Sequence, residues 1–180
     1  MPFDATQTLG TGRASEDEAF AFYDQLDPVD CDLMLGRWRG DGYTTGHALD
    51  GVLEAFGWYG KEFVDAEHVH PLLFTTRSGG IRTLNPALMP LKTGLRFPQL
   101  NNDFSARLFP WLQPLLATGS SKARLRMTEY RGKISATMCY DQRPIHDVFR
   151  RVDDNTVLGA MDFKGMDQTL FFLLRREQPR

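Results

Sequence analysis

Alternating apolar and polar positions run through the last third of the chain. The segments with this pattern are rich in β-branched and aromatic residues and cover 122–130, 133–140, 144–151, 156–163 and 168–176. Short turn sequences separate them, such as Arg131-Gly132 and Lys164-Gly165. The pattern predicts five antiparallel strands joined by hairpins in a meander.

An earlier strand is predicted over residues 36–42. Period 2 places Trp38 on one face with Gly36 and Gly40, and places the charged residues on the other face. A large ring between glycines is typical of a sharply curved strand, because nothing crowds the ring and the backbone can bend.

Two further strands are predicted over 59–65 and 67–76, the second bent at Pro71. With the meander and the glycine-rich strand, the total is about eight. Eight strands can close into an antiparallel barrel whose interior holds side chains or one small ligand. The predicted fold is therefore mainly β, built as a barrel.

Helical spacing marks two segments of the chain. Ser15 and Glu18 form the capping-box pattern at the start of a helix, and Pro28 ends that helix. A shorter helix is predicted within 47–58, closed by Gly57. The first helix is expected outside the barrel, over one end of it or elsewhere on its surface.

A long irregular segment covers residues 77–118 and contains Pro86, Pro90, Pro98, Pro110 and Pro114. It is rich in apolar side chains, and long loops of this kind are uncommon unless they cover a site. We interpret it as a wrap or lid, partly helical near Trp111. Its aromatic stretch 97–116 is a candidate interface for a homodimer.

The length of 180 residues favours one domain. We expect a flexible arm followed by a single domain whose successive parts are the first strands, the wrap and the meander. The boundaries are 1–14 for the arm, 15–180 for the domain, and 30–76, 77–120 and 121–176 for its parts.

Composition and charge exclude several classes of protein. The net charge is −2, which does not favour a nucleic-acid partner. No apolar run is long enough for a transmembrane segment, and the first residues lack the order of a signal peptide. Cys31 and Cys139 do not suggest a disulfide framework, so a cytoplasmic location is the expectation.

The first part of the chain contains the run Gly36-Arg37-Trp38-Arg39-Gly40, followed by Thr45-Gly46-His47 and Trp58-Tyr59-Gly60-Lys61-Glu62-Phe63. This set of runs resembles the family named for its GXWXG motif. The later part contains Tyr130-Arg131-Gly132-Lys133, Ser135-Ala136-Thr137-Met138 and Pro144-Ile145, with Asp147, Phe149, Gly159 and Met161-Asp162. These residues resemble the domain of unknown function that is paired with the GXWXG family. Together these regions cover most of residues 30–176. The biochemistry of this family is largely uncharacterised.

The Gly-X-Trp start also resembles the calycin group, which includes lipocalins, fatty-acid-binding proteins and nitrobindin-like barrels. This resemblance implies a calycin-like barrel that the tryptophan closes at one end, with a basic residue of the last strand over its ring. Arg175 or Arg176 could take that place over Trp38. Gly36, Trp38 and Gly40 are then structural residues.

Nitrobindin-like barrels bind haem through a histidine late in the chain, and this sequence departs from that pattern. Residues 167–172 contain no histidine, which disfavours haem. His68 and His70 would share a face of a strand and could hold a metal, but no motif supplies a third ligand. We therefore expect no metal and no cofactor.

Asp147 is the acidic residue of most interest. Period 2 groups Asp147 with Ile145 and Phe149, and an inward carboxylate needs a partner. Lys61, His70 and Tyr140 are candidate partners. Val148, on the opposite face, is apolar too, so the alternation does not decide which face is buried. The alternative is an Asp147 that faces outward or ties down a loop.

Our leading hypothesis is binding or carriage of a hydrophobic or amphipathic small molecule, such as a fatty acid or other lipid, inside the barrel. The candidate ligand-binding residues are Tyr43, Trp58, Lys61, Phe63, His70, Met138, Tyr140, Asp147, Phe149 and Met161. The rival is a small-molecule enzyme of isomerase or hydrolase type that uses Asp147 as acid or base. A third reading is an interaction module whose barrel is filled by its own side chains.

Overall fold

The computed structural model describes residues 13–89 and 103–178, and its main feature is one antiparallel sheet of ten strands. The bounds of these strands are β1 (Asp27–Pro28), β2 (Gly36–Tyr43), β3 (Trp58–Phe63), β4 (Val69–Thr75), β5 (Ile81–Thr83), β6 (Ala123–Tyr130), β7 (Lys133–Tyr140), β8 (Ile145–Asp153), β9 (Thr156–Phe163) and β10 (Leu170–Arg176). A mainly β fold is thus confirmed, and β6 to β10 form the predicted meander.

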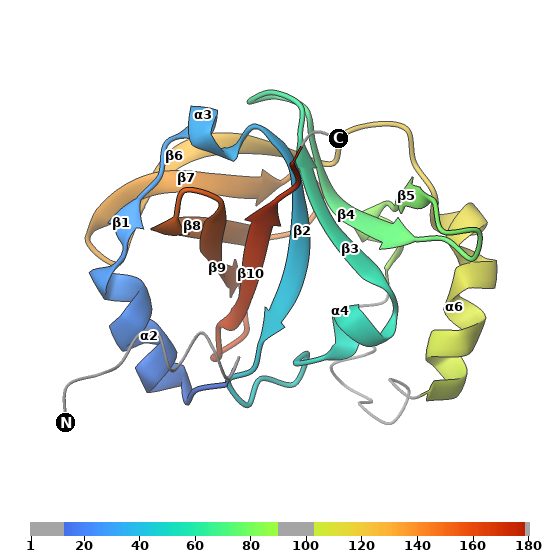
Figure 1. Ribbon diagram of the computed structural model, residues 1–180, viewed down its shortest axis with the longest axis horizontal. Helices are drawn as coiled ribbons and strands as arrows, with labels where there is room; N and C mark the ends of the chain where they lie inside the picture. Colours follow the sequence, from blue (N-terminus) through green and yellow to red (C-terminus); the bar gives the residue numbers. More distant parts are fainter. Residues whose placement is uncertain (1–12, 90–102, 179–180) are drawn as a thin grey trace.

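The order of the strands places the last strand beside an early one (Figure 1). It runs β1-β8-β7-β6-β4-β3-β2-β10-β9, with β5 paired to β4 and β8 paired also to β9. The pairings form an uneven ring, because β4 and β6 share the single pair Val69↔Ala123, whereas β6 and β7 pair along their whole length. The last strand, β10, lies beside β2, which carries the glycine-rich motif.

The N-terminal helix α2 (Glu16–Gln25) begins at the predicted capping box, in which Ser15 and Glu18 cap each other. It does not lie over an end of the sheet but covers the outer face of β9 and β10. Its buried residues pack there in a second apolar cluster with Tyr43, Leu158, Ala160, Phe171 and Leu173. This packing gives the late strands two buried faces.

The segment predicted to be irregular is more regular than expected. It contains β5, the short 3₁₀ helix η1 (Pro86–Leu88) and the helix α6 (Asp103–Leu116), which confirms helix near Trp111. Residues 90–102 of the predicted wrap, and residues 1–12 of the predicted arm, lie outside the described part. Among the described helices, none is long and apolar enough to cross a membrane.

Two short helices flank the motif strand. The helix α3 (Cys31–Met34) precedes β2, and α4 (Val52–Ala55) is shorter than the helix predicted over 47–58. Gly57 follows α4 with a φ of 81°, so it ends this helix as expected.

Trp38 is fully buried, and Arg176 covers its ring. The guanidinium carbon of Arg176 lies 4.3 Å from the ring centroid, and the indole Nε1 of Trp38 donates to the Met34 carbonyl at 2.7 Å. Arg176 also donates to the carbonyls of Leu33 and Leu35. Arg175 points to solvent and pairs with Asp41, so the arginine that meets Trp38 is Arg176.

We expect Arg176→Gln to lower the free energy of unfolding by about 1–3 kcal/mol, because it removes the cation from the Trp38 ring and two donors from backbone carbonyls. Urea unfolding followed by circular dichroism measures this loss. The matched control is Arg175→Gln, which breaks an exposed ion pair and should cost less than about 1 kcal/mol. Equal losses for the two variants would contradict this role of Arg176.

Candidate functional site

A break in the alternation of β3 brings two side chains into the interior. The pairing of β3 with β4 shifts register on both sides of Gly60, whose φ is 147°. Trp58 and Lys61 are therefore both buried, although strict alternation would place them on opposite faces. Lys61 lies directly across from Trp38 of β2, which links the motif to the site.

The ammonium group of Lys61 is held by three oxygen atoms. Its Nζ lies 2.8 Å from Oδ2 of Asp147, 3.3 Å from the carbonyl oxygen of Pro71 and 3.5 Å from the hydroxyl of Tyr140. The side chains of Lys61 and Asp147 are 4% and 1% exposed. This is a buried ion pair between β3 and β8, two strands that are not neighbours in the sheet.

Aromatic rings surround the same ammonium group. Its Nζ lies 5.0 Å from the ring centroid of Phe172, 5.6 Å from that of Trp58 and 5.7 Å from that of Tyr140. Rings at these distances attract a cation through their negative faces. Lys61 is therefore positioned by both a carboxylate and an aromatic enclosure.

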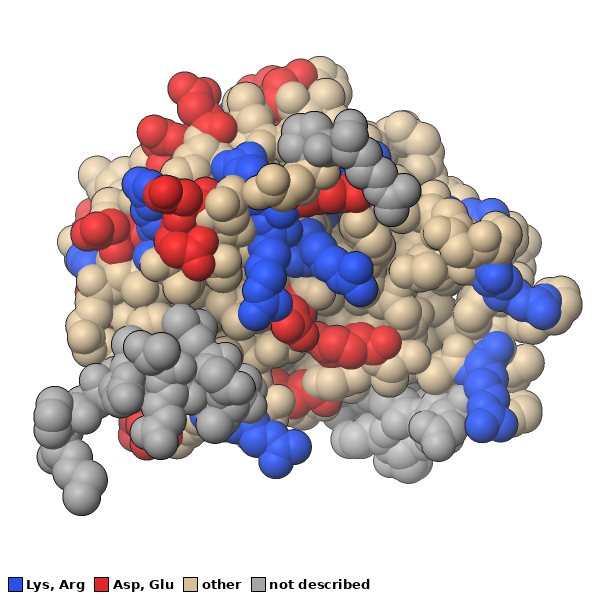
Figure 2. All heavy atoms as spheres, in the orientation of Figure 1, with Lys and Arg blue, Asp and Glu red and all other residues tan. Residues whose placement is uncertain are grey.

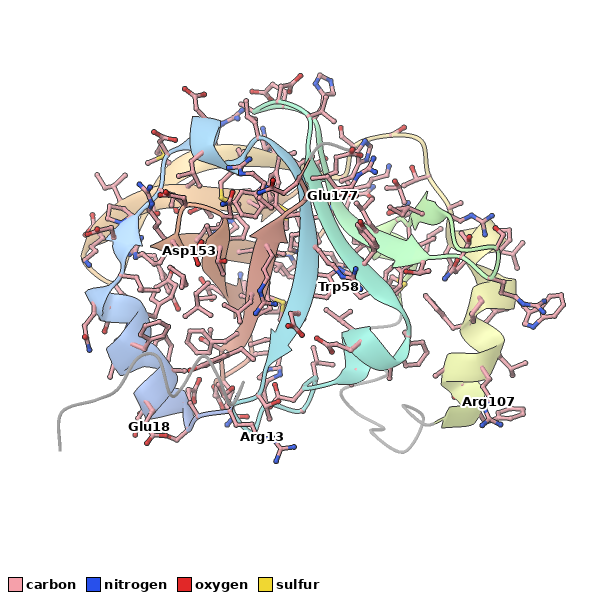
Figure 3. All side chains as sticks on the ribbon, viewed as in Figure 1. Arg13, Glu18, Trp58, Arg107, Asp153 and Glu177 are labelled. Atoms are coloured by element: carbon pink, nitrogen blue, oxygen red, sulfur yellow. The ribbon has the colours of Figure 1, made fainter. Side chains whose placement is uncertain are left out.

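The glycine Gly40 of the motif makes room for one of these rings. A Cβ atom at Gly40 would lie 2.2 Å from the six-membered ring of Trp58, far inside van der Waals contact. The motif thus contributes to the site indirectly, because the second glycine of the pattern Gly-X-Trp-X-Gly leaves the space that the Trp58 ring occupies. Figure 3 shows Trp58 on β3, close to α4.

Asp147 faces the interior from the middle of β8. Its cross-strand neighbours are Met138 and Met161, and Ile145 and Phe149 share its buried face. The orientation that Val148 left open is settled by the contact of Asp147 with Lys61, and Val148 is buried as well. The helix α2 packs nearby, where Tyr23 donates to the Val148 carbonyl. The prediction of an inward Asp147 with a partner is confirmed, and that partner is Lys61.

Burial shifts the pKa values of the Asp147 carboxyl and the Tyr140 hydroxyl, the two acidic groups beside Lys61. Loss of hydration raises the pKa of the Asp147 carboxyl, and the charge and hydrogen bond of Lys61 oppose this rise. Loss of hydration, together with the nearby Asp147 charge, raises the pKa of the Tyr140 hydroxyl well above its ordinary value. Tyr140 is thus a neutral hydroxyl at physiological pH.

Two polar atoms of this region have no hydrogen-bond partner among the described residues. They are Oδ1 of Asp147, which is an acceptor, and Nε1 of Trp58, which is a donor. Buried polar atoms nearly always have a partner, supplied by the protein or by ordered water. The interior therefore presents one free acceptor and one free donor near the Lys61–Asp147 pair.

Most of the predicted site residues meet in one apolar cluster with Trp38. Those in this cluster are Trp58, Phe63, Met138, Tyr140, Phe149 and Met161. Two others lie outside this cluster. Tyr43 packs in the second cluster under α2 and also lines the pocket described below, and His70 lies across from Glu62 on β3.

The two histidines considered for a metal do not form a ligand set. His68 is exposed and its Nδ1 contacts the Asp65 carboxylate. Within residues 13–89 and 103–178, no group of three or more His, Cys, Asp or Glu side chains could hold a metal ion.

Two buried residues are not among the predicted ligand-binding residues. Phe172 makes the nearest ring contact with Lys61, and the alternation of the last strand predicts it on the inner face. Arg150 is 1% exposed and lies over the Tyr23 ring, donating to the Tyr130 carbonyl. No sequence pattern predicted the burial of Arg150, because this burial depends on α2 covering the outer face of β8.

A pocket opens at the α4 side of the sheet, between β2, α4 and β10. The residues that line it are Gly42, Tyr43, Thr44, Leu49, Asp50, Gly51, Leu53, Glu54, Trp58, Leu170, Phe171 and Phe172. Its walls include Trp58 and Phe172, the rings that also contact Lys61. These two side chains therefore border both the pocket and the surroundings of Lys61.

Comparison with known proteins identifies two matching families and two similar proteins. The family described as GXWXG protein matches residues 21–79, and the domain of unknown function DUF4334 matches residues 121–176. The crystal structure of a protein from Thermomonospora curvata is 36% identical, with a TM-score of 0.71, and the match covers 96% of this chain and 95% of that one.

The second similar protein is much longer than this chain. It is the polyketide synthase GfsE of Streptomyces halstedii, which is 33% identical over 106 residues. The match covers 57% of this chain but spans only 3% of the length of the synthase.

Proposed function

This chain belongs to the GXWXG family and carries the DUF4334 domain paired with it, and we propose that it binds a hydrophobic or amphipathic small molecule. The ligand occupies the interior of the sheet, which we take to be a calycin-like barrel closed between β4 and β6. Trp38 and Arg176 close one part of this interior, and the pocket beside Trp58 is the route into it.

The observation that carries the proposal is the buried Lys61–Asp147 pair, which lies among aromatic rings and beside polar atoms that have no hydrogen-bond partner. A pair that served stability alone would have its remaining lone pairs satisfied, because an unmet buried polar atom costs about 1–3 kcal/mol. Here Oδ1 of Asp147 and Nε1 of Trp58 are both unmet. A ligand that offers a donor and an acceptor would satisfy both atoms.

The charge balance of the site defines the polar end of this ligand. Lys61 is already neutralised by Asp147 at 2.8 Å, so an anionic ligand would meet the carboxylate beside it. We therefore expect an uncharged group, such as a hydroxyl or carbonyl, on an apolar chain. A fatty acid would bind as the protonated acid. A ligand of polyketide type, with hydroxyl and carbonyl groups on a carbon chain, also fits this description and agrees with the similarity to a polyketide synthase.

The test is ligand binding measured by displacement of an apolar fluorescent dye, with native mass spectrometry to detect what copurifies. We expect a long-chain alcohol or hydroxy ketone to bind more tightly than the matching carboxylate at neutral pH. Trp58→Phe, which removes the indole donor but keeps a ring, should weaken binding of the alcohol about 5- to 10-fold. A protein without copurified ligand that binds nothing across this panel would refute the proposal.

Acid–base catalysis is the second candidate function, and the raised pKa of Asp147 favours it. A carboxyl whose pKa is shifted toward neutrality can take up or release a proton from a bound carbonyl compound. Lys61 at 2.8 Å would stabilise the carboxylate form. Exchange of α-protons of a bound ketone with deuterated water, present in the parent and absent in Asp147→Asn, would favour catalysis over simple binding.

A further inference from the structure

The helix α6 has an inner apolar face that explains its position. Phe109 is buried against the rings of Phe56 and Phe74, with centroids 5.1 and 5.2 Å apart. Gln113 on the same face donates to the Thr75 carbonyl at 3.1 Å. These contacts attach α6 to β4 and to the segment after α4, and they leave the opposite face of the helix outward.

That outward face is also apolar. Its residues lie at positions i, i+4, i+7, i+8 and i+11, and their exposed fractions are 72% for Phe104, 44% for Leu108, 64% for Trp111, 49% for Leu112 and 77% for Leu115. Five large apolar side chains on one stripe are far more than isolated surface residues. Exposed patches of this kind mark interaction surfaces.

The sequence around this stripe is basic. Between Glu67 and Glu129 it has one acidic residue, Asp103, and eight basic residues, of which Arg77 and Arg107 lie beside the stripe (Figure 3). Figure 2 shows Lys and Arg side chains over the α6 side of the molecule and no Asp or Glu at that margin. Arg107 projects outward from α6 in Figure 3, and the Arg77 guanidinium lies 3.9 Å over the Trp111 ring.

We propose that the outward face of α6 docks onto an anionic lipid surface. An apolar stripe of Phe, Leu and Trp flanked by arginines is the pattern of a helix that lies in the plane of a membrane interface. The stripe itself offers no hydrogen-bonding side chain besides the indole of Trp111, which suits acyl chains better than a polar protein surface. Arg77 and Arg107 are placed to meet lipid phosphates. The proposal does not depend on what occupies the interior of the sheet.

The fluorescence of Trp111 provides a direct test, because Trp38 and Trp58 are buried while Trp111 is 64% exposed. The full chain is mixed with vesicles of phosphatidylcholine alone or with about one third phosphatidylglycerol. We expect a blue shift of the emission and protection from iodide quenching with the anionic vesicles, and reversal of both by salt. Flotation of the same mixtures measures the partition coefficient.

Two variants separate the apolar and charged contributions. Replacing Leu112 and Leu115 together by serine keeps the Trp111 reporter and should weaken vesicle binding at least tenfold, since it removes apolar area from the stripe. Arg107→Gln should weaken binding to anionic vesicles about fivefold. The matched controls lie across the molecule from α6, on β7 and β8 (Figure 1). They are Ile134→Ser, at a residue 60% exposed, and Arg151→Gln, and they should leave binding unchanged.

Three results would overturn the proposal. The first is no binding to either kind of vesicle. The second is equal loss of binding in the controls and the α6 variants. The third is a stable dimer in sedimentation that Leu112→Ser with Leu115→Ser converts to a monomer, because a second copy of the chain would then occupy this face.

Discussion

Replacing Lys61 by methionine is expected to lower the free energy of unfolding by about 3–5 kcal/mol at neutral pH, because the variant leaves the Asp147 carboxylate buried without its cation. The side chain of Asp147 is 1% exposed and its nearest charged atom is Nζ of Lys61, 2.8 Å away. Methionine fills a volume similar to the lysine stem, so the loss reports the charge and not a cavity. Urea unfolding at fixed ionic strength measures it.

The penalty of Lys61→Met should depend on pH with a definite sign. Burial already raises the pKa of Asp147 in the folded protein, and removal of Lys61 raises it further. The folded variant then binds a proton that the unfolded chain has released, so its stability falls as pH rises from the ordinary value through the raised pKa. We expect the variant to approach the parent near pH 4, about the ordinary pKa of an aspartate, and to show the full loss at neutral pH.

A second substitution tests whether the unpaired Asp147 carboxylate causes the loss of stability in Lys61→Met. Adding Asp147→Leu to Lys61→Met removes the stranded carboxylate and should recover most of the lost stability, and should abolish the pH dependence. The exposed pair Arg175–Asp41 provides the control, since Asp41→Asn should cost less than about 1 kcal/mol. If the double variant is no more stable than Lys61→Met at neutral pH, the buried charge is not the source of the loss.

The position of Asp147 shows how far the sequence could lead. Alternation grouped it with Ile145 and Phe149, which is correct, but the apolar Val148 left the opposite orientation open. Both faces of β8 are buried, because α2 covers the outer one, and period 2 carries no information about a strand with two buried faces. The interior position of Asp147 therefore could be established only from the structure. That a buried Asp147 would need a partner could be predicted from the sequence.

The partner Lys61 was a candidate but could not be placed from the sequence. Alternation puts Trp58 and Lys61 on opposite faces of β3, and only the irregularity at Gly60 brings both inside. Hydrophobic periodicity predicted the strands well, and the local irregularities that build the site are what it could not reveal.

The helix α6 illustrates a different limit. Pro110 and Pro114 argued against a helix in this segment, since proline removes a backbone donor and crowds the preceding turn. Packing of Phe109 onto Phe56 and Phe74 favours the helix nevertheless. The sequence predicted helix only near Trp111, and tertiary contacts support a helix over the whole of Asp103–Leu116 in spite of its two prolines.

Gly60→Ala is expected to destabilise the protein by more than about 4 kcal/mol, enough to prevent folding in a domain of ordinary stability. A Cβ atom at this position would lie 1.9 Å from the carbonyl oxygen of Trp38 and 2.8 Å from the amide nitrogen of Gly40. Both are backbone atoms of β2, so no side-chain rotation relieves the clash. The φ of 147° adds strain for any residue with a side chain.

The fate of Gly60→Ala also tests how the site is built. If the variant folds, β2 and β3 must separate or the irregularity must move, and Lys61 then loses its place beside Asp147. We therefore expect any soluble Gly60→Ala protein to lack the stability contribution of Lys61, so that adding Lys61→Met costs little. Gly119→Ala is the control, because nothing lies within 4 Å of the added atom and its effect should stay within about 0.5 kcal/mol. A Gly60→Ala protein as stable as the parent, with Lys61→Met still costly, would show that the shift at Gly60 does not place the lysine.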